Sequence, residues 1–183
     1  MSDPVLQPIK GIGSQLIDDN DKPVSGPGVF ISNSKTLSAN NTTANVPIFT
    51  VVGSVQILAI YGVVTTALGN NTAAYWRLND GSNTPSITLS TGTTLSSVAA
   101  GSVIVKKGLA AAALTLLNNS ASLVSEPTTL ETSYFSPFVA TQITAGTTNI
   151  EFVYTTTDTP TTGVITFYCQ YLPIGSGSKL QTV

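Results

Sequence analysis

The longest apolar run in the sequence covers residues 46–68, VPIFTVVGSVQILAIYGVVTTAL. Its content of glycine, threonine and β-branched residues favours β-strands over a helix. Alternate residues of a strand share a face. The two faces of the second half of the run carry Val55, Ile57, Ala59, Tyr61 and Val63, and Leu58, Ile60 and Val64 around Gly62. Since a strand of a two-layer β protein normally has one solvated face, we expect one of these faces to be covered by an N-terminal arm or a neighbouring subunit.

Short alternating segments, separated by turns rich in Gly, Asn, Asp and Pro, continue to the end of the chain. We expect strands at residues 74–78, 86–90, 98–106, the second half of 108–117, 133–141, 149–156 and 164–172. About eight to ten strands at this spacing predict an all-β fold, an antiparallel β-sandwich of jelly-roll-like topology. Its predicted core contains Trp76, Phe152, Phe167 and Tyr171.

The first 45 residues differ from the rest in composition. They contain four prolines and seven charged residues. Proline at this density excludes long helices and central strands. Short apolar pieces remain, so we expect residues 1–45 to form an extended arm with one or two short strands that orders on assembly, with a disordered tail as the alternative. The sandwich would then occupy residues 46–174, and residues 175–183 would form a flexible Gly/Ser tail.

Charged residues are unusually scarce. They make up 9% of this chain, whereas about 25% is typical of soluble domains. A surface of uncharged polar residues suits permanent contact with other subunits. The net charge of −2 and the absence of a basic stripe argue against a nucleic-acid partner. We expect Lys106 and Lys107, the only adjacent basic pair, to mark a solvated strand end, and we expect neither a secretory signal nor a membrane helix.

The sequence offers little chemistry. It has no histidine, which removes the commonest general base and transition-metal ligand. We expect the lone Cys169 to be a buried, inert thiol. The carboxylates beyond the arm are Asp80, Glu126, Glu131, Glu151 and Asp158. No spacing brings two of them together as glycoside hydrolysis requires, so we expect no catalytic residues, no cofactor and no metal site.

Aromatic side chains leave one alternative function open. Tyr75 is expected on the strand face opposite Trp76, and Tyr134 and Phe135 lie beside a proline. Aromatic rings stack on sugar rings, so the second hypothesis is a receptor- or carbohydrate-binding head of a phage fibre or adhesin.

Two segments resemble a pattern found in small virion structural proteins of tailed bacteriophages. They are IFTVVGSVQILAIYGVVTTAL at residues 48–68 and GVITFYCQYLP at residues 163–173. The resemblance implies a capsid decoration, cement or minor head protein without catalytic residues. It also implies a location in the virion, assembled in the host cytoplasm, with the major capsid protein as partner. Closed assembly predicts a homo-oligomer, a dimer or trimer.

Apolar side chains of the arm and of the long apolar run are the candidate assembly contacts. They are Ile9, Ile12, Leu16, Ile17, Val29, Phe30, Ile31, Leu58, Ile60 and Val64. An arm that crosses a neighbour would stabilise the assembly by about 25 cal/mol per Å² of apolar surface buried.

Overall fold

A computed structural model of the chain describes residues 28–38, 42–108, 111–117, 137–143, 146–156 and 162–183. These residues form ten strands and no helix, and hence no helix that could span a membrane. The strands are β1 (Val29–Thr36), β2 (Thr43–Val52), β3 (Ser54–Thr66), β4 (Asn71–Asn79), β5 (Val103–Val105), β6 (Thr115–Leu117), β7 (Phe138–Thr141), β8 (Thr148–Thr156), β9 (Val164–Pro173) and β10 (Lys179–Thr182).

The strands form two antiparallel sheets. The six-stranded sheet, called the large sheet below, has the order β1-β9-β3-β5-β6, and β7 pairs with β3 as well. The four-stranded sheet, called the small sheet, has the order β10-β2-β8-β4. The predicted all-β antiparallel sandwich is therefore confirmed, while its jelly-roll topology stays a prediction.

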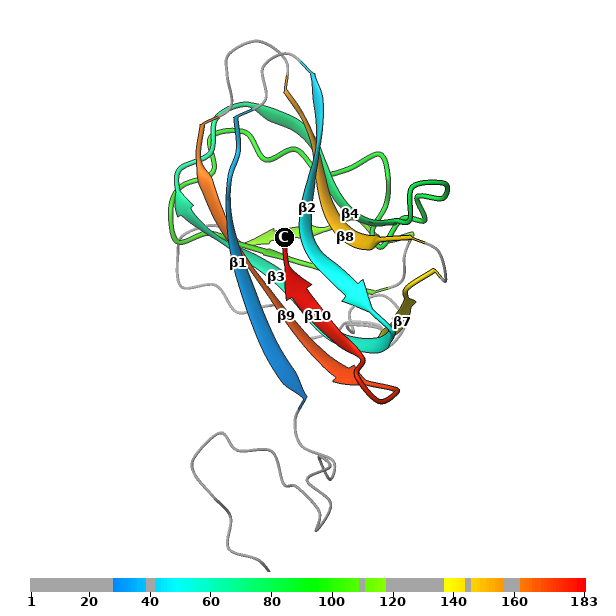
Figure 1. Cartoon of the computed structure of the whole chain (residues 1–183). Helices are drawn as coiled ribbons and strands as arrows, with labels where there is room; N and C mark the ends of the chain where they lie inside the picture. The colour runs from blue at the N-terminus through cyan, green and yellow to red at the C-terminus, as the bar shows by residue number, and fades with distance from the viewer. Residues whose placement is uncertain (1–27, 39–41, 109–110, 118–136, 144–145, 157–161) are drawn as a thin grey trace, which may run out of the picture.

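An aromatic core joins the two sheets, whose strands lie in separate layers in Figure 1. Phe152 of β8 and Phe167 of β9 contact each other across the layers, with ring centroids 5.1 Å apart. The Trp76 ring packs 6.0 Å from that of Phe152. These three side chains are fully buried and Tyr171 is nearly so, which confirms the predicted core.

A β-bulge divides β3, the central strand of the large sheet. Ile57 lies opposite Tyr171 of β9, but the next paired residues are Ala59 and Gln170, so Leu58 is an extra residue on β3. An extra residue shifts the two-residue period by one position. Before Leu58, the odd-numbered residues of β3 therefore point into the core. After Leu58, the even-numbered residues do.

The bulge corrects the predicted faces of the long apolar run. Val55 and Ile57 point into the core before the bulge, and Ile60 and Val64 do so after it. Each predicted face is thus split between the core and the outside. Ile60 and Val64 are 1% and 0% exposed, so the prediction that they form an assembly contact is wrong for this structure.

Gly62 allows β3 to pack closely against β9. A Cβ at this position would lie 2.8 Å from Ile165 Cγ2 and 3.2 Å from Phe167 Cδ1. Both contacts belong to buried core side chains. The glycine therefore leaves the room that two larger core residues occupy.

The expected domain boundaries also need correction. Strand β1 lies within the predicted arm, yet it pairs with β9 over its full length. Asn33 Nδ2 of β1 donates a hydrogen bond of 2.7 Å to the Ile48 carbonyl of β2, which ties the edge strand of the large sheet to the small sheet. The predicted tail contains β10, which pairs with β2. Residues 28–38 and 175–183 thus belong to the sandwich, and residues 1–27 lie outside the described part.

Two predicted strands are shorter than expected. In the region of residues 86–90, the backbone forms only an isolated bridge between Ser86 and Arg77 of β4. Ile87 is buried there, but Leu89 is 36% exposed. The segment 98–106 contributes only the three residues of β5. Turns and loop hydrogen bonds take up the rest of both segments, such as that from Leu68 N to the Val98 carbonyl.

Candidate functional site

The carboxylates in the described part of the chain are both held by hydrogen bonds. Asp80 Oδ1 accepts from the backbone amides of Ser82 at 2.8 Å and Asn83 at 2.6 Å, and these bonds lower the pKa of Asp80. Glu151 is ion-paired. The other three candidates, Glu126, Glu131 and Asp158, lie outside the described residues, and the described ones include no cluster of three metal-ligating side chains.

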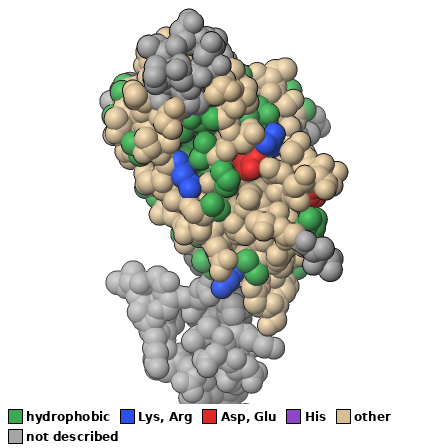
Figure 2. All heavy atoms as spheres, turned by 45° about the horizontal axis from the view of Figure 1, so that its top comes forward, with side chains coloured by type: hydrophobic (Ala, Val, Ile, Leu, Met, Phe, Trp, Pro, Cys, Tyr) green, Lys and Arg blue, Asp and Glu red, His purple; other side chains and the backbone are tan. Residues whose placement is uncertain are grey.

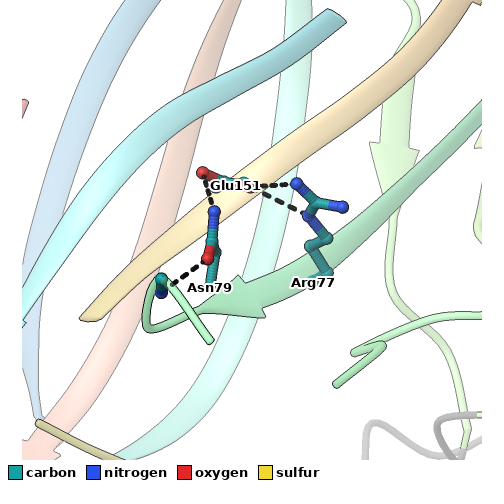
Figure 3. Close-up of polar contacts among 4 residues, drawn as sticks. Arg77, Asn79 and Glu151 are labelled. Carbon is teal, nitrogen blue, oxygen red and sulfur yellow. Dashed lines mark hydrogen bonds and ion pairs between the residues drawn. The ribbon is translucent and has the colours of Figure 1, made fainter. Parts of the chain in front are cut away.

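Glu151 forms a buried polar cluster on the outer side of the small sheet. Its Oε2 accepts from Arg77 Nε at 2.8 Å and lies 2.8 Å from a second guanidinium nitrogen, while its Oε1 accepts from Asn79 Nδ2 at 2.9 Å. Figure 3 shows the three side chains converging between β4 and β8. Two-nitrogen contact with Arg is a strong, directional form of ion pair. Both carboxylate oxygens are occupied, so this arrangement fixes strand register rather than offering a general base.

Tyr75 lies beside this cluster. It is the neighbour of Val153 on β8, and Asn45 of β2 pairs with Val153 from the other side. Tyr75 is half-buried and lies on the strand face opposite the buried Trp76, as predicted. Tyr134 and Phe135, the other expected sugar-contacting residues, lie outside the described residues.

The outer side of the large sheet carries several large apolar side chains among uncharged polar ones. The residues that β1, β3, β5 and β9 direct outward alternate with their core residues, and none of them is charged. Its larger side chains, called the outer apolar face below, are Phe30, Leu58, Tyr61, Val63, Val105 and Tyr168. All of them are half-buried or exposed, with Phe30 62% exposed.

Two tyrosines form the centre of the outer apolar face. Tyr61 of β3 lies opposite Tyr168 of β9, and their rings stack with centroids 5.0 Å apart at 12°. Val105 of β5 flanks Tyr61 on the other side. Leu58 extends the face toward β1, because its Cδ1 would lie 3.2 Å from a Cβ on Gly28. Polar side chains lie between these apolar ones, because Gln170 of β9 pairs with both Phe30 and Ala59.

Figure 2 shows how few charges the surface carries. On the face in view, blue and red side chains are few, and a red one lies beside a blue one, close to a group of green hydrophobic side chains. The described residues contain five basic and two acidic side chains, and both acids have partners. The surface of the described part therefore carries few charges.

Lys106 is a buried lysine, and the prediction that it marks a solvated strand end is wrong. Its side chain is 3% exposed. Its Nζ donates to the Gly108 carbonyl and lies 5.9 Å from the Phe138 ring centroid. Desolvation lowers the pKa of Lys106. The alternation of residues 103–106, which places Lys106 in phase with buried Ile104, is the signal that could have identified it.

Cys169 is buried between the sheets, as expected from its position in an apolar strand. Burial raises the pKa of its thiol well above the ordinary range. Because the thiolate is the reactive form, this cysteine is chemically inert in the folded protein.

The predicted assembly contacts fall into four groups. Phe30 and Leu58 lie on the outer apolar face, and Val29 and Ile31 pack against the edge of the core. Ile60 and Val64 lie in the core. The remaining four, Ile9, Ile12, Leu16 and Ile17, lie outside the described residues. Comparisons with protein-family models, curated proteins and solved structures gave no match.

Proposed function

We propose that this protein is a structural subunit of a bacteriophage virion, a capsid decoration, cement or minor head protein that acts through subunit contacts. The observation that carries the proposal is the outer apolar face with its stacked Tyr61 and Tyr168. Exposed apolar patches of this kind, free of charged residues, mark protein–protein contact sites. The sequence resemblance to virion structural proteins supplies the particular setting.

The energetics of the sandwich support contact rather than catalysis. Burial of apolar surface contributes about 25 cal/mol per Å², and a stable interface removes about 800 Å² from each partner. A flat outer sheet face of uncharged side chains can supply such an area without desolvating charges. By contrast, the carboxylate of Glu151 already accepts three hydrogen bonds or ion-pair contacts.

Protein composition of purified particles tests this proposal. Density-gradient-purified virions of the phage that encodes the chain should contain it, as detected by mass spectrometry. In solution, light scattering should give two or three times the mass of one chain. A protein that remains monomeric and is absent from washed particles would overturn the proposal.

The outer side of the small sheet favours a second function, binding of carbohydrate at a host surface. An aromatic ring next to amide, carboxylate and guanidinium groups is a combination that sugar sites use. Tyr75 lies beside Arg77, Asn79 and Glu151 in this way. A reproducible signal on a glycan array that Tyr75→Ala abolishes and Tyr168→Ala leaves intact would support this function. Absence of any signal would exclude it for the glycans tested.

A further inference from the structure

We propose that residues 1–27 of one copy bind across the outer apolar face of a second copy. This inference rests on the proposed function and names the surface through which subunits would be linked. Three observations carry it: the position where these residues join the sandwich, the match of apolar character, and the length of the segment.

Residues 1–27 join the sandwich at one end of the outer apolar face. Gly28 immediately precedes β1, and its φ of +91° is a backbone conformation that favours glycine. A Cβ placed on Gly28 would lie 3.2 Å from the Cδ1 of Leu58, and Leu58 belongs to the outer apolar face. Phe30, two residues later, is 62% exposed on the same side of β1. Each segment therefore starts beside the outer apolar face of its own subunit. In a closed ring, that face would be covered by the segment of the neighbouring subunit.

The segment and the face have matching chemistry. Ile9, Ile12, Leu16 and Ile17 give the segment apolar side chains at short intervals, between prolines that prevent a long helix. An extended stretch of 27 residues reaches about 90 Å at ~3.3 Å per residue, whereas five strands at ~4.8 Å span roughly 24 Å. The segment is thus long enough to leave its own subunit and cross the whole sheet of a neighbour.

The charges do not oppose this pairing. Residues 1–27 contain four aspartates and two lysines, a balance of −2. Among the basic residues of the described part, Arg77 is paired with Glu151 on the small sheet and Lys106 is buried. The outer apolar face itself is uncharged, so the apolar side chains can dock without burying a charge.

Binding to a second copy, rather than to its own sheet, is what the proposed function requires. A segment folded back on its own subunit covers the face but creates no link between subunits. A segment exchanged between copies produces a closed ring of identical contacts, because each subunit both donates and accepts one segment.

Cysteine crosslinking in the full chain tests the exchange. A tagged chain with Ser14→Cys and an untagged chain with Ser32→Cys are co-expressed and treated with a short bis-maleimide. Ser14 is a polar residue beside Ile12, and Ser32 is an exposed residue on the same side of β1 as Phe30, so both replacements keep the apolar side chains of the proposed contact. Cys169 is buried and its high pKa keeps it unreactive. We expect a covalent dimer of tagged and untagged chains. The matched control is Asn45→Cys, an exposed position on the small sheet, which should give at most one tenth of that product.

Three outcomes would overturn the inference. One is a crosslink that forms only within a single chain carrying both Ser14→Cys and Ser32→Cys, which places the segment on its own sheet. Another is crosslinking of Ser32→Cys chains to each other without the Ser14→Cys chain, which indicates contact between two faces. The third is no crosslink above the Asn45→Cys control. If the chain is nonetheless present in purified particles, the proposed function stands and only the docking site fails.

Discussion

The Gly62→Ala substitution tests whether the core is packed as described. The new Cβ would lie 2.8 Å from Ile165 Cγ2, closer than real side-chain contacts allow. Ile165 is 0% exposed and β-branched, so it can neither rotate away nor move into solvent. Phe167 Cδ1, at 3.2 Å, closes the other side. The backbone of β3 or β9 must therefore shift to admit a single methyl group.

The expected cost follows from two opposing effects. Overpacking a core by one methylene costs about 1 to 3 kcal/mol, while replacing glycine by alanine restricts the unfolded chain and returns about 0.4 to 1 kcal/mol. We expect a net loss of about 1 to 2 kcal/mol in the free energy of unfolding, which lowers the thermal midpoint by roughly 2 to 8 °C for a chain of this size.

Fluorescence of Trp76 provides the assay. It is the only tryptophan in the chain and is fully buried in the core, so its emission reports global unfolding in a urea titration. Gly146→Ala is the matched control. A Cβ there would also approach a side-chain carbon to 2.8 Å, but that carbon is the Cδ1 of Ile143, which is 37% exposed and can move aside. If Gly62→Ala is as stable as Gly146→Ala, the packing argument for β3 and β9 is refuted.

Two further substitutions test the buried charges. Arg77→Met should lower the free energy of unfolding by roughly 2 to 4 kcal/mol, because it leaves the buried carboxylate of Glu151 without its cation. The double variant Arg77→Met/Glu151→Leu should lose less stability than the sum of the losses of the two single variants. Additive losses in urea titrations would contradict this. Lys106→Met removes a group whose pKa is lowered in the folded state, so the unfolded chain binds that proton more tightly. The free energy of unfolding of the wild type, relative to that of Lys106→Met, should therefore rise as the pH rises toward 10.5, the unfolded value. A difference that stays constant with pH in thermal melts would show that desolvation of Lys106 is unimportant.

Alternation in the sequence was sufficient to predict the sandwich but not its boundaries. The strands around residues 149–156 and 164–172 follow a strict two-residue period, and β8 and β9 lie there. Strand β1 was assigned to the arm because proline, glycine and charge dominate its surroundings. The alternation of Val29 and Ile31 with polar residues is nevertheless a strand signal, and pairing with β9 outweighs the composition around it.

The sequence predicts some residues of the outer apolar face but not its composition, since Phe30 and Leu58 are among the predicted contacts whereas Val105 and Tyr168 are not. An excess of apolar side chains on the long run indicated that something outside the core must be covered. Leu58 looks no different in sequence from its neighbours, however, and only the register of β9 makes it the bulged residue. Because a bulge depends on the partner strand, no local pattern could show that Tyr61 would face outward and Ile60 inward.

The copy number of the chain in purified particles tests the central claim most directly. Quantitative mass spectrometry should give a fixed ratio of this chain to the major shell subunit for the wild type. Particles assembled with Phe30→Ser should carry at least tenfold less, although the free variant melts at the wild-type temperature, since Phe30 is 62% exposed. Absence of the wild-type chain from particles, or equal occupancy by Phe30→Ser, would contradict a structural role that depends on the outer apolar face.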